Sequence, residues 1–98
     1  MVERYVFAKL VAAQATEAGR AEVRARAAVL ADVPGITAVV IGRPADGAAL
    51  HAWDLSLVLR FASPTDAARA LAAPAYTQFH DDYLVPRAQV IKAWSFEV

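Results

Sequence analysis

The clearest hydrophobic pattern in the chain lies at residues 53–61. Large apolar residues occupy positions 53, 55, 57, 59 and 61, while positions 54, 56 and 60 are polar. Alternation with a period of two is typical of a β-strand with one face in a hydrophobic core. Val58 alone is apolar on the second face, which indicates that this face is partly covered as well. The pattern therefore predicts a central strand at 53–61.

Three further segments show strand character, at residues 2–10, 36–41 and 89–98. β-Branched and aromatic residues, which favour strands, are frequent in them. In the first segment the two faces differ in character. One face carries Arg4, Val6, Ala8 and Leu10, and the other carries Tyr5, Phe7 and Lys9.

Helical patterns separate these strands. A first helix is predicted from Glu17, behind a Thr cap, to Ala31, because small and apolar residues recur there at helical spacing. Ser63 followed by proline predicts the start of a second helix that continues to residue 72. Residues 75–83 are expected to add one or two helical turns that end at Pro86. Residues 42–49, rich in Gly, Pro and Asp, are predicted to be a turn.

The order β-α-β-β-α-β predicts an α+β domain with the ferredoxin-like arrangement. Right-handed connections then give a four-stranded antiparallel sheet with both helices on one face. The other face has no cover within the chain, and an exposed apolar sheet face usually marks an interface. A second copy with two-fold symmetry would bury it, which predicts a homodimer. The expected interface residues are Tyr5, Phe7, Val58, Ile91 and Ala93.

Composition narrows the classes of function. The chain has 98 residues, which is the size of one domain, and 10 basic against 10 acidic residues. A neutral chain lacks the basic surface that nucleic acids require, so no nucleic-acid partner is expected. There is no cysteine, which excludes disulfides and thiolate chemistry and is compatible with a cytoplasmic protein. No signal peptide or long apolar run is present, so no membrane partner is expected.

Several fragments, in the right order, resemble the stress-responsive A/B-barrel (Dabb) family. They include the end of the first strand at Lys9-Leu10, Val33-Pro34-Gly35-Ile36, the strand at 53–61, and Pro74-Ala75-Tyr76 with Phe79 three residues later. The resemblance spans nearly the whole chain. It implies a ferredoxin-like protomer and a homodimer in which two sheets form an α/β barrel.

The resemblance says less about function, because most members of the family have no established activity. One branch consists of polyketide cyclases that work without cofactor or metal and use His side chains. A general base must take up a proton near neutral pH, and His suits that role. At the corresponding positions this chain has Arg4, Leu55, Ala70 and Tyr76. No His is left at these positions, so the resemblance does not carry over the cyclase mechanism.

The ligand-pocket candidates are therefore Arg4, Trp53, Leu55 and Tyr76, and no catalytic residue is assigned. Arg4 is predicted either to hold an anion or carbonyl group beside the Tyr76 hydroxyl, or to reach solvent from the end of its strand. His80-Asp81-Asp82 is expected to be a solvated helix end, since neighbouring residues on a helix point in different directions. No metal site and no cofactor are expected.

Three hypotheses follow. The first is a small dimeric Dabb-like protein without established catalysis that binds a small apolar or aromatic ligand between sheet and helices. The second is a cofactor-free enzyme on the same barrel, similar to a polyketide cyclase or a monooxygenase, that uses Arg4 and Tyr76. The third is a structural assembly module.

Overall fold

A single antiparallel sheet organises the protein. The computed structural model describes all 98 residues and contains four strands in the spatial order β2-β3-β1-β4. Every neighbouring pair of strands is antiparallel. The strands are β1 (Val2–Leu10), β2 (Ile36–Gly42), β3 (Leu55–Phe61) and β4 (Ala88–Glu97). This order confirms the predicted ferredoxin-like topology.

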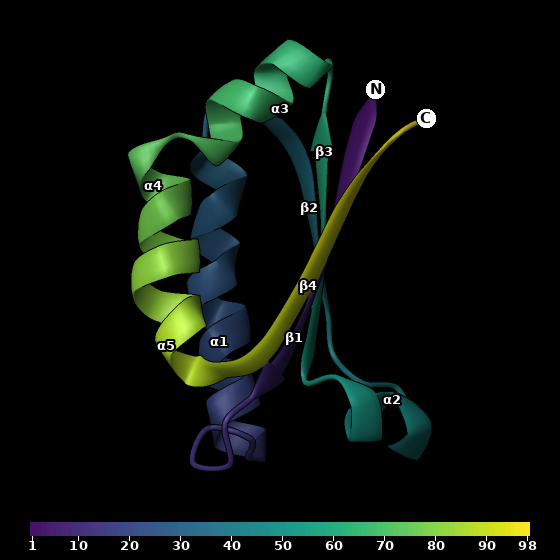
Figure 1. Ribbon diagram of the computed structural model, residues 1–98, viewed down its shortest axis with the longest axis vertical. Helices are drawn as coiled ribbons and strands as arrows, with labels where there is room; N and C mark the ends of the chain where they lie inside the picture. The colour runs from purple at the N-terminus through teal and green to yellow at the C-terminus, as the bar shows by residue number, and fades with distance from the viewer.

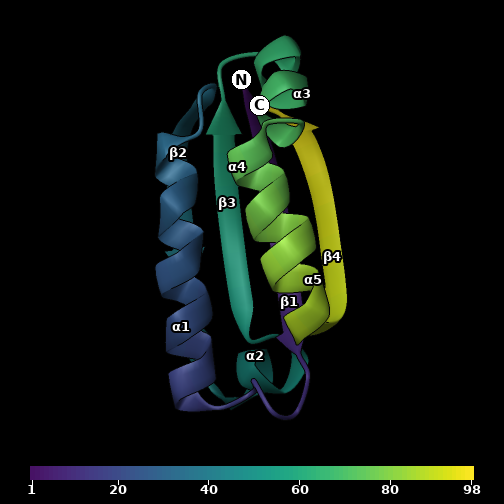
Figure 2. The ribbon, with the colours of Figure 1, turned by 90° about the vertical axis from the view of Figure 1, so that its left-hand side faces the viewer.

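Helical segments form a layer on one face of the sheet, as Figures 1 and 2 show from two directions. The first is α1 (Glu17–Ala27), which continues as the 3₁₀ helix η1 (Ala28–Asp32). The second part of the layer comprises α3 (Pro64–Leu71), α4 (Pro74–Thr77), the π-helical segment η2 (Gln78–Leu84) and α5 (Val85–Arg87). None of these helices is long and apolar enough to cross a membrane.

Local capping explains where the main helices begin. The Thr16 hydroxyl accepts a hydrogen bond from the Gly19 amide at 3.0 Å, and the Ser63 hydroxyl accepts one from the Asp66 amide at 3.1 Å. Each bond satisfies one of the amides that the first helical turn leaves without a partner. Pro64 occupies the first turn of α3, where a missing N–H is no disadvantage. Both predicted helix starts are confirmed.

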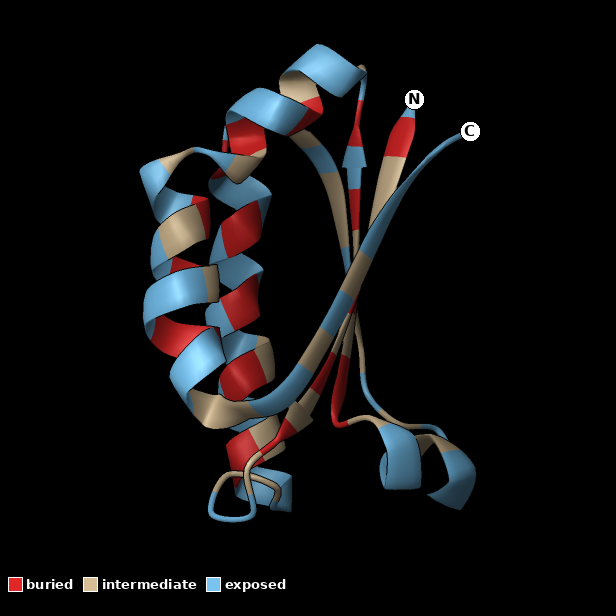
Figure 3. Ribbon diagram, viewed as in Figure 1, coloured by how far each residue is buried: buried red, intermediate tan, exposed pale blue.

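The hydrophobic core lies between the sheet and the helical layer. β3 contributes Leu55, Leu57, Leu59 and Phe61, each at most 2% exposed. The facing helical segments contribute their own buried side chains, so that in Figure 3 the buried residues mark the helix faces turned to the sheet. They include Val23, Ala27, Leu30, Ala67, Ala70, Tyr76, Phe79, Tyr83 and Leu84. The period-two alternation of β3 thus has the expected cause.

The structure corrects the sequence prediction in the connection between β2 and β3. The segment predicted as a turn contains a helix, α2 (Gly47–Ala52), whose first turn is capped by Asp46. This helix lies on the side of the sheet away from α1 and α4 (Figure 1). Trp53 ends α2 and is outside β3, which begins at Leu55.

The last helical region is longer than predicted. Helical geometry continues from Pro74 through Pro86 to Arg87, although Pro86 was expected to end it. Pro86 lies within the short α5. A proline usually ends an α-helix because it cannot donate the backbone hydrogen bond. Pro86 does not end this helical region, because the preceding η2 already departs from α-helical bonding.

The expected face of two residues in β4 is also wrong. Ile91 is paired with Ala8 and Ala93 with Val6, and both partners lie in the core. Ile91 and Ala93 therefore pack against the helix-covered side. The uncovered side of β4 carries Val90, Lys92, Trp94 and Phe96 instead. Because side chains alternate along a strand, an error of one residue in phase exchanges the two faces completely.

Candidate functional site

Arg4 and Tyr76 come together between the sheet and the helices. Arg4 is on the covered face of β1, opposite Leu59 of β3 and Ser95 of β4. Its terminal Nη1 donates a hydrogen bond to the Ser95 hydroxyl at 3.0 Å. Tyr76, on α4, is 7% exposed. The two side chains are close enough for the positive charge of Arg4 to act on the pKa of Tyr76.

Arg4 is incompletely satisfied. Its Nε is buried and has no hydrogen-bond partner. Buried polar atoms in native proteins nearly always have a partner, and leaving one unpaired costs about 1–3 kcal/mol. A guanidinium in this condition is prepared to donate to an oxygen acceptor.

A hollow of about 280 Å³ lies at the α3 end of the sheet, and neither Arg4 nor Tyr76 is among its lining residues. Ser95, the hydrogen-bond partner of Arg4, is part of its wall. The lining residues are Val2, Pro64, Ala67, Ser95, Phe96 and Glu97. The hollow thus lies between strands β1 and β4 and helix α3, on the covered side of the sheet where a ligand was expected.

Tyr76 has a second polar neighbour. The ring of His80, one turn further along, stacks on the Tyr76 ring with a centroid separation of 5.7 Å. The His80 Nδ1 lies 2.8 Å from a carboxylate oxygen of Asp81. Burial raises the pKa of Tyr76 above its ordinary value, and the charge of Arg4 opposes that shift. His80 was expected in a solvated helix end, and its contact with Tyr76 is that of side chains four residues apart on a helix.

The other two pocket candidates lie elsewhere. Leu55 is a core residue of β3, 2% exposed, and pairs with Ala8 rather than with Arg4. Trp53 contacts Phe7 on the uncovered side, with ring centroids 5.6 Å apart. Both line a different hollow of about 260 Å³ next to α2. The four candidates therefore belong to two separate places. Ala70, at the remaining cyclase position, is fully buried in α3.

The uncovered face of the sheet is rich in aromatic residues. Tyr5, Phe7 and Val58 lie on it as expected, and Tyr5 packs against Phe96 at 6.0 Å between ring centroids. Trp94 and Phe96 of β4 belong to the same face and are 51% and 56% exposed. The face also carries one ion pair, between Arg60 and Glu3, with 2.7 Å between nitrogen and oxygen.

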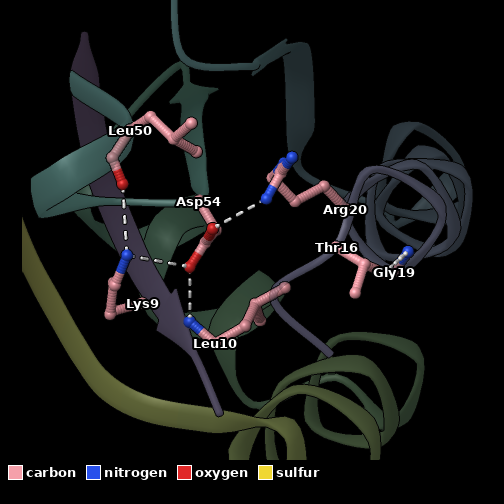
Figure 4. Close-up of polar contacts among 7 residues, drawn as sticks. All are labelled: Lys9, Leu10, Thr16, Gly19, Arg20, Leu50 and Asp54. Atoms are coloured by element: carbon pink, nitrogen blue, oxygen red, sulfur yellow. Dashed lines mark hydrogen bonds and ion pairs between the residues drawn. The ribbon is translucent and has the colours of Figure 1, made fainter. Parts of the chain in front are cut away.

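A buried carboxylate ties this face to the rest of the molecule (Figure 4). Asp54, 1% exposed, accepts a hydrogen bond from the Leu10 amide at 2.8 Å. It also lies 3.6 Å from Lys9 Nζ and 3.4 Å from an Arg20 nitrogen. The sequence places Asp54 on the polar face of the predicted strand, but Asp54 lies just before β3 and turns inward, where it links β1 to α1.

No three His, Asp or Glu side chains lie close enough together to hold a metal ion. A further hollow of about 330 Å³ between α1 and the loop before α2 has mixed charge, with Arg20, Arg24 and Arg43 beside Glu17 and Asp46.

Similarity to known proteins is found in the fold and not in the sequence. No protein-family model matches the sequence, and no curated protein has a matching sequence. Solved structures match over nearly the whole of this chain. A Dabb family protein with a ferredoxin-like fold from Mesorhizobium loti superposes with a TM-score of 0.80 at 15% identity, over 99% of this chain and 95% of that chain. The chain has the ferredoxin-like fold of the Dabb proteins.

Two other ferredoxin-like structures are similarly close. Hydroxynitrile lyase from Passiflora edulis has a TM-score of 0.80 at 15% identity, covering 99% of this chain and 92% of that one. A dimeric ferredoxin-like protein of unknown function from Thermobifida fusca has a TM-score of 0.80 at 14% identity, with 99% and 90% covered. The resemblance to the Dabb family is thus confirmed for the ferredoxin-like fold, on which proteins of different function are built.

Proposed function

We propose that this protein is a homodimeric α/β-barrel protein that binds a small apolar or aromatic molecule bearing a carboxylate or carbonyl oxygen. The ligand would enter the hollow beneath α3 and place its oxygen at Arg4. The observation that carries this proposal is the buried Arg4 Nε, which has no hydrogen-bond partner, on a side chain that is bonded to the Ser95 of the hollow wall. A cytoplasmic location remains a prediction from composition.

The chemistry of the site suits this class of ligand. Arg donates hydrogen bonds in a planar fork that matches a carboxylate, and such charge-assisted bonds are stronger than neutral ones. The wall residues Val2, Pro64 and Ala67 would contact an apolar body. The Tyr76 hydroxyl is protonated at neutral pH, as a tyrosine is even without the rise in pKa that burial causes, and would serve as a second donor.

Native mass spectrometry of freshly purified protein tests the ligand. We expect extra mass on the wild-type protein, and its loss in Arg4→Gln, which keeps a polar side chain but removes the charge. Arg69→Gln, on exposed α3 surface, is the matched control and should retain the extra mass. Retention of the same extra mass by Arg4→Gln would contradict the proposal. It would also be contradicted if the wild-type protein carries no extra mass and does not bind added aromatic carboxylates.

The dimer is supported by the uncovered aromatic face and by the description of the Thermobifida fusca structure as dimeric. Phe7→Asp and Val58→Asp would each place an unpaired carboxylate in the interface and should give monomers by light scattering. Val29→Asp is the matched control, because Val29 is 49% exposed on the helical side. Wild-type mass for both interface variants, with unchanged circular dichroism, would refute the sheet-to-sheet arrangement.

A cofactor-free enzyme is the second candidate, favoured by the His80–Asp81 pair stacked on Tyr76. A carboxylate on Nδ1 leaves the other ring nitrogen free to accept a proton, which is the arrangement of a general base. Turnover of a polyketide, a quinol or a cyanohydrin that is abolished in both Tyr76→Phe and His80→Gln would support the enzyme. Ligand binding without turnover would contradict the enzyme and favour the binding protein.

A further inference from the structure

The second hollow, between α2 and the uncovered face of the sheet, has the features of a ligand site of its own. It measures about 260 Å³ and does not include Arg4 or Tyr76. Its lining is mostly apolar and comes from β1, β3, α2 and the loop before α2. The lining residues are Phe7, Arg43, Pro44, Ala45, Ala49, Trp53, Leu55 and Ser56.

The wall of this hollow is held in place by the buried polar network. Lys9, which lies 3.6 Å from the buried Asp54 carboxylate, donates a hydrogen bond to the Leu50 carbonyl of α2 at 3.1 Å. Asp46 caps the start of α2, and the Trp53 amide donates to the Ala49 carbonyl at its end, at 2.8 Å each. Figure 4 shows Lys9 between Leu50 and Asp54. The helix is therefore anchored to the sheet rather than carried on a free loop.

The chemistry of the hollow has an apolar part and a cationic rim. Phe7 and Trp53 form an aromatic pair, tilted by 38°, that presents a large apolar surface. Such aromatic walls favour flat aromatic ligands through offset stacking. Arg43 is exposed at the rim and takes part in none of the ion pairs of the structure. Asp46, the acid of the same loop, is engaged as the cap of α2.

We propose that this hollow binds a small aromatic carboxylate, with its ring against Phe7 and Trp53 and its carboxylate at Arg43. An apolar pocket with one convergent charge is the usual form of a small-molecule site. Ser56 is the second polar residue of the wall. The site is independent of Arg4. Phe7 also belongs to the proposed dimer face, so binding is measured on the protein in its native oligomeric state.

Fluorescence of Trp53 is a direct probe, because the chain has two tryptophans and Trp94→Phe leaves Trp53 alone. We expect saturable quenching by 2-naphthoate in this background. Arg43→Gln should weaken binding of 2-naphthoate about tenfold, the loss of one charge-assisted hydrogen bond. It should leave binding of the uncharged 2-naphthalenemethanol unchanged. Arg69→Gln is the matched control for loss of a surface charge, and Arg4→Gln separates this site from the one under α3.

Ala49→Leu fills the hollow from the α2 side and should abolish binding of both compounds while keeping the circular dichroism spectrum. Unaltered binding in Ala49→Leu would place the ligand elsewhere and overturn the proposal. Absence of saturable quenching at millimolar 2-naphthoate would overturn it as well. Equal effects of Arg43→Gln on the acid and the alcohol would refute the role of Arg43 and with it the assignment to carboxylates. An effect of Arg4→Gln alone would assign the binding to the other site.

Discussion

The two faces of the sheet differ in how far their apolar side chains are buried. On the covered face, β3 side chains such as Phe61 are fully buried against the helical layer. On the uncovered face, Trp94 and Phe96 are more than half exposed, although they are larger than most core residues. The covered face therefore accounts for the stability of a single protomer. The uncovered face adds little to that stability, and its apolar character is better explained by a partner or a ligand.

The largest expected effect separates these two faces by stability. Phe61→Ala should destabilise the protein by about 4 kcal/mol, because it leaves a cavity in a close-packed core. The cost should be the same at low and high protein concentration. Phe96→Ala is the counterpart on the uncovered face, and its cost should grow with concentration, since it acts through association. Urea denaturation at two protein concentrations measures both. A cost for Phe96→Ala that does not depend on concentration would argue against the dimer.

The next largest expected effect on stability is at the buried Asp54 carboxylate. Asp54→Ala should cost about 3 kcal/mol, because it leaves Lys9 and Arg20 without their shared partner and the Leu10 amide unpaired. Asp82→Ala, an exposed acid outside the ion pairs, should change stability by less than about 0.5 kcal/mol. The midpoint of urea unfolding compares the two. Equal midpoints would mean that the Asp54 network is not needed for stability.

A smaller and local effect is expected at α2. Asp46→Ala removes a helix cap worth about 1 kcal/mol. The Leu50 amide, which bonds to the Asp46 carbonyl, should then exchange with solvent about fivefold faster, while core amides of β3 are unaffected. Thr16→Ala removes the equivalent cap of α1 and should leave Leu50 exchange unchanged. Hydrogen exchange followed by NMR gives both rates. A global rather than local change after Asp46→Ala would show that α2 is part of the cooperative core.

The sequence pattern predicts the covered face better than the uncovered one, and the reason is physical. In β3, apolar and polar residues alternate, so only one phase buries the apolar set. In β4, Ile91 and Ala93 are apolar on one side and Trp94 and Phe96 on the other, so the pattern alone does not determine the phase.

The sequence also predicts only part of the candidate sites. Arg4 and Tyr76 could be grouped through the family resemblance, because the fold brings these positions together. Helix α2 was missed although Asp46 is a normal cap residue, since its six residues follow a Gly/Pro-rich loop and form no amphipathic repeat. Trp53 was therefore assigned to the wrong hollow. The contact of His80 with Tyr76 has the four-residue spacing of helix neighbours, and both residues lie in the helical turns predicted at 75–83, but His80 was assigned to a solvated helix end.

The last comparison sets a covered tyrosine against an uncovered one at alkaline pH. Burial raises the pKa of Tyr76, and a hydrogen bond to Glu3 raises the pKa of Tyr5. In both cases the folded state favours the neutral phenol, whose pKa in the unfolded chain is about 10. This contribution to stability is complete below pH 10 and is lost as the pH rises through the folded pKa.

Unfolding free energy measured between pH 9 and 11 should therefore fall with pH in the wild-type protein. Tyr76→Phe should make that fall shallower, because the phenylalanine has no proton to lose. At protein concentrations low enough to give monomers, Tyr5→Phe should change the slope less, since the uncovered face is then open to water, which also solvates the phenolate. If Tyr76→Phe and wild type show the same slope, the Tyr76 hydroxyl is solvated in the folded protein. Arg4 would then face water rather than a closed site, and the uncovered face would be the better place to look for the ligand.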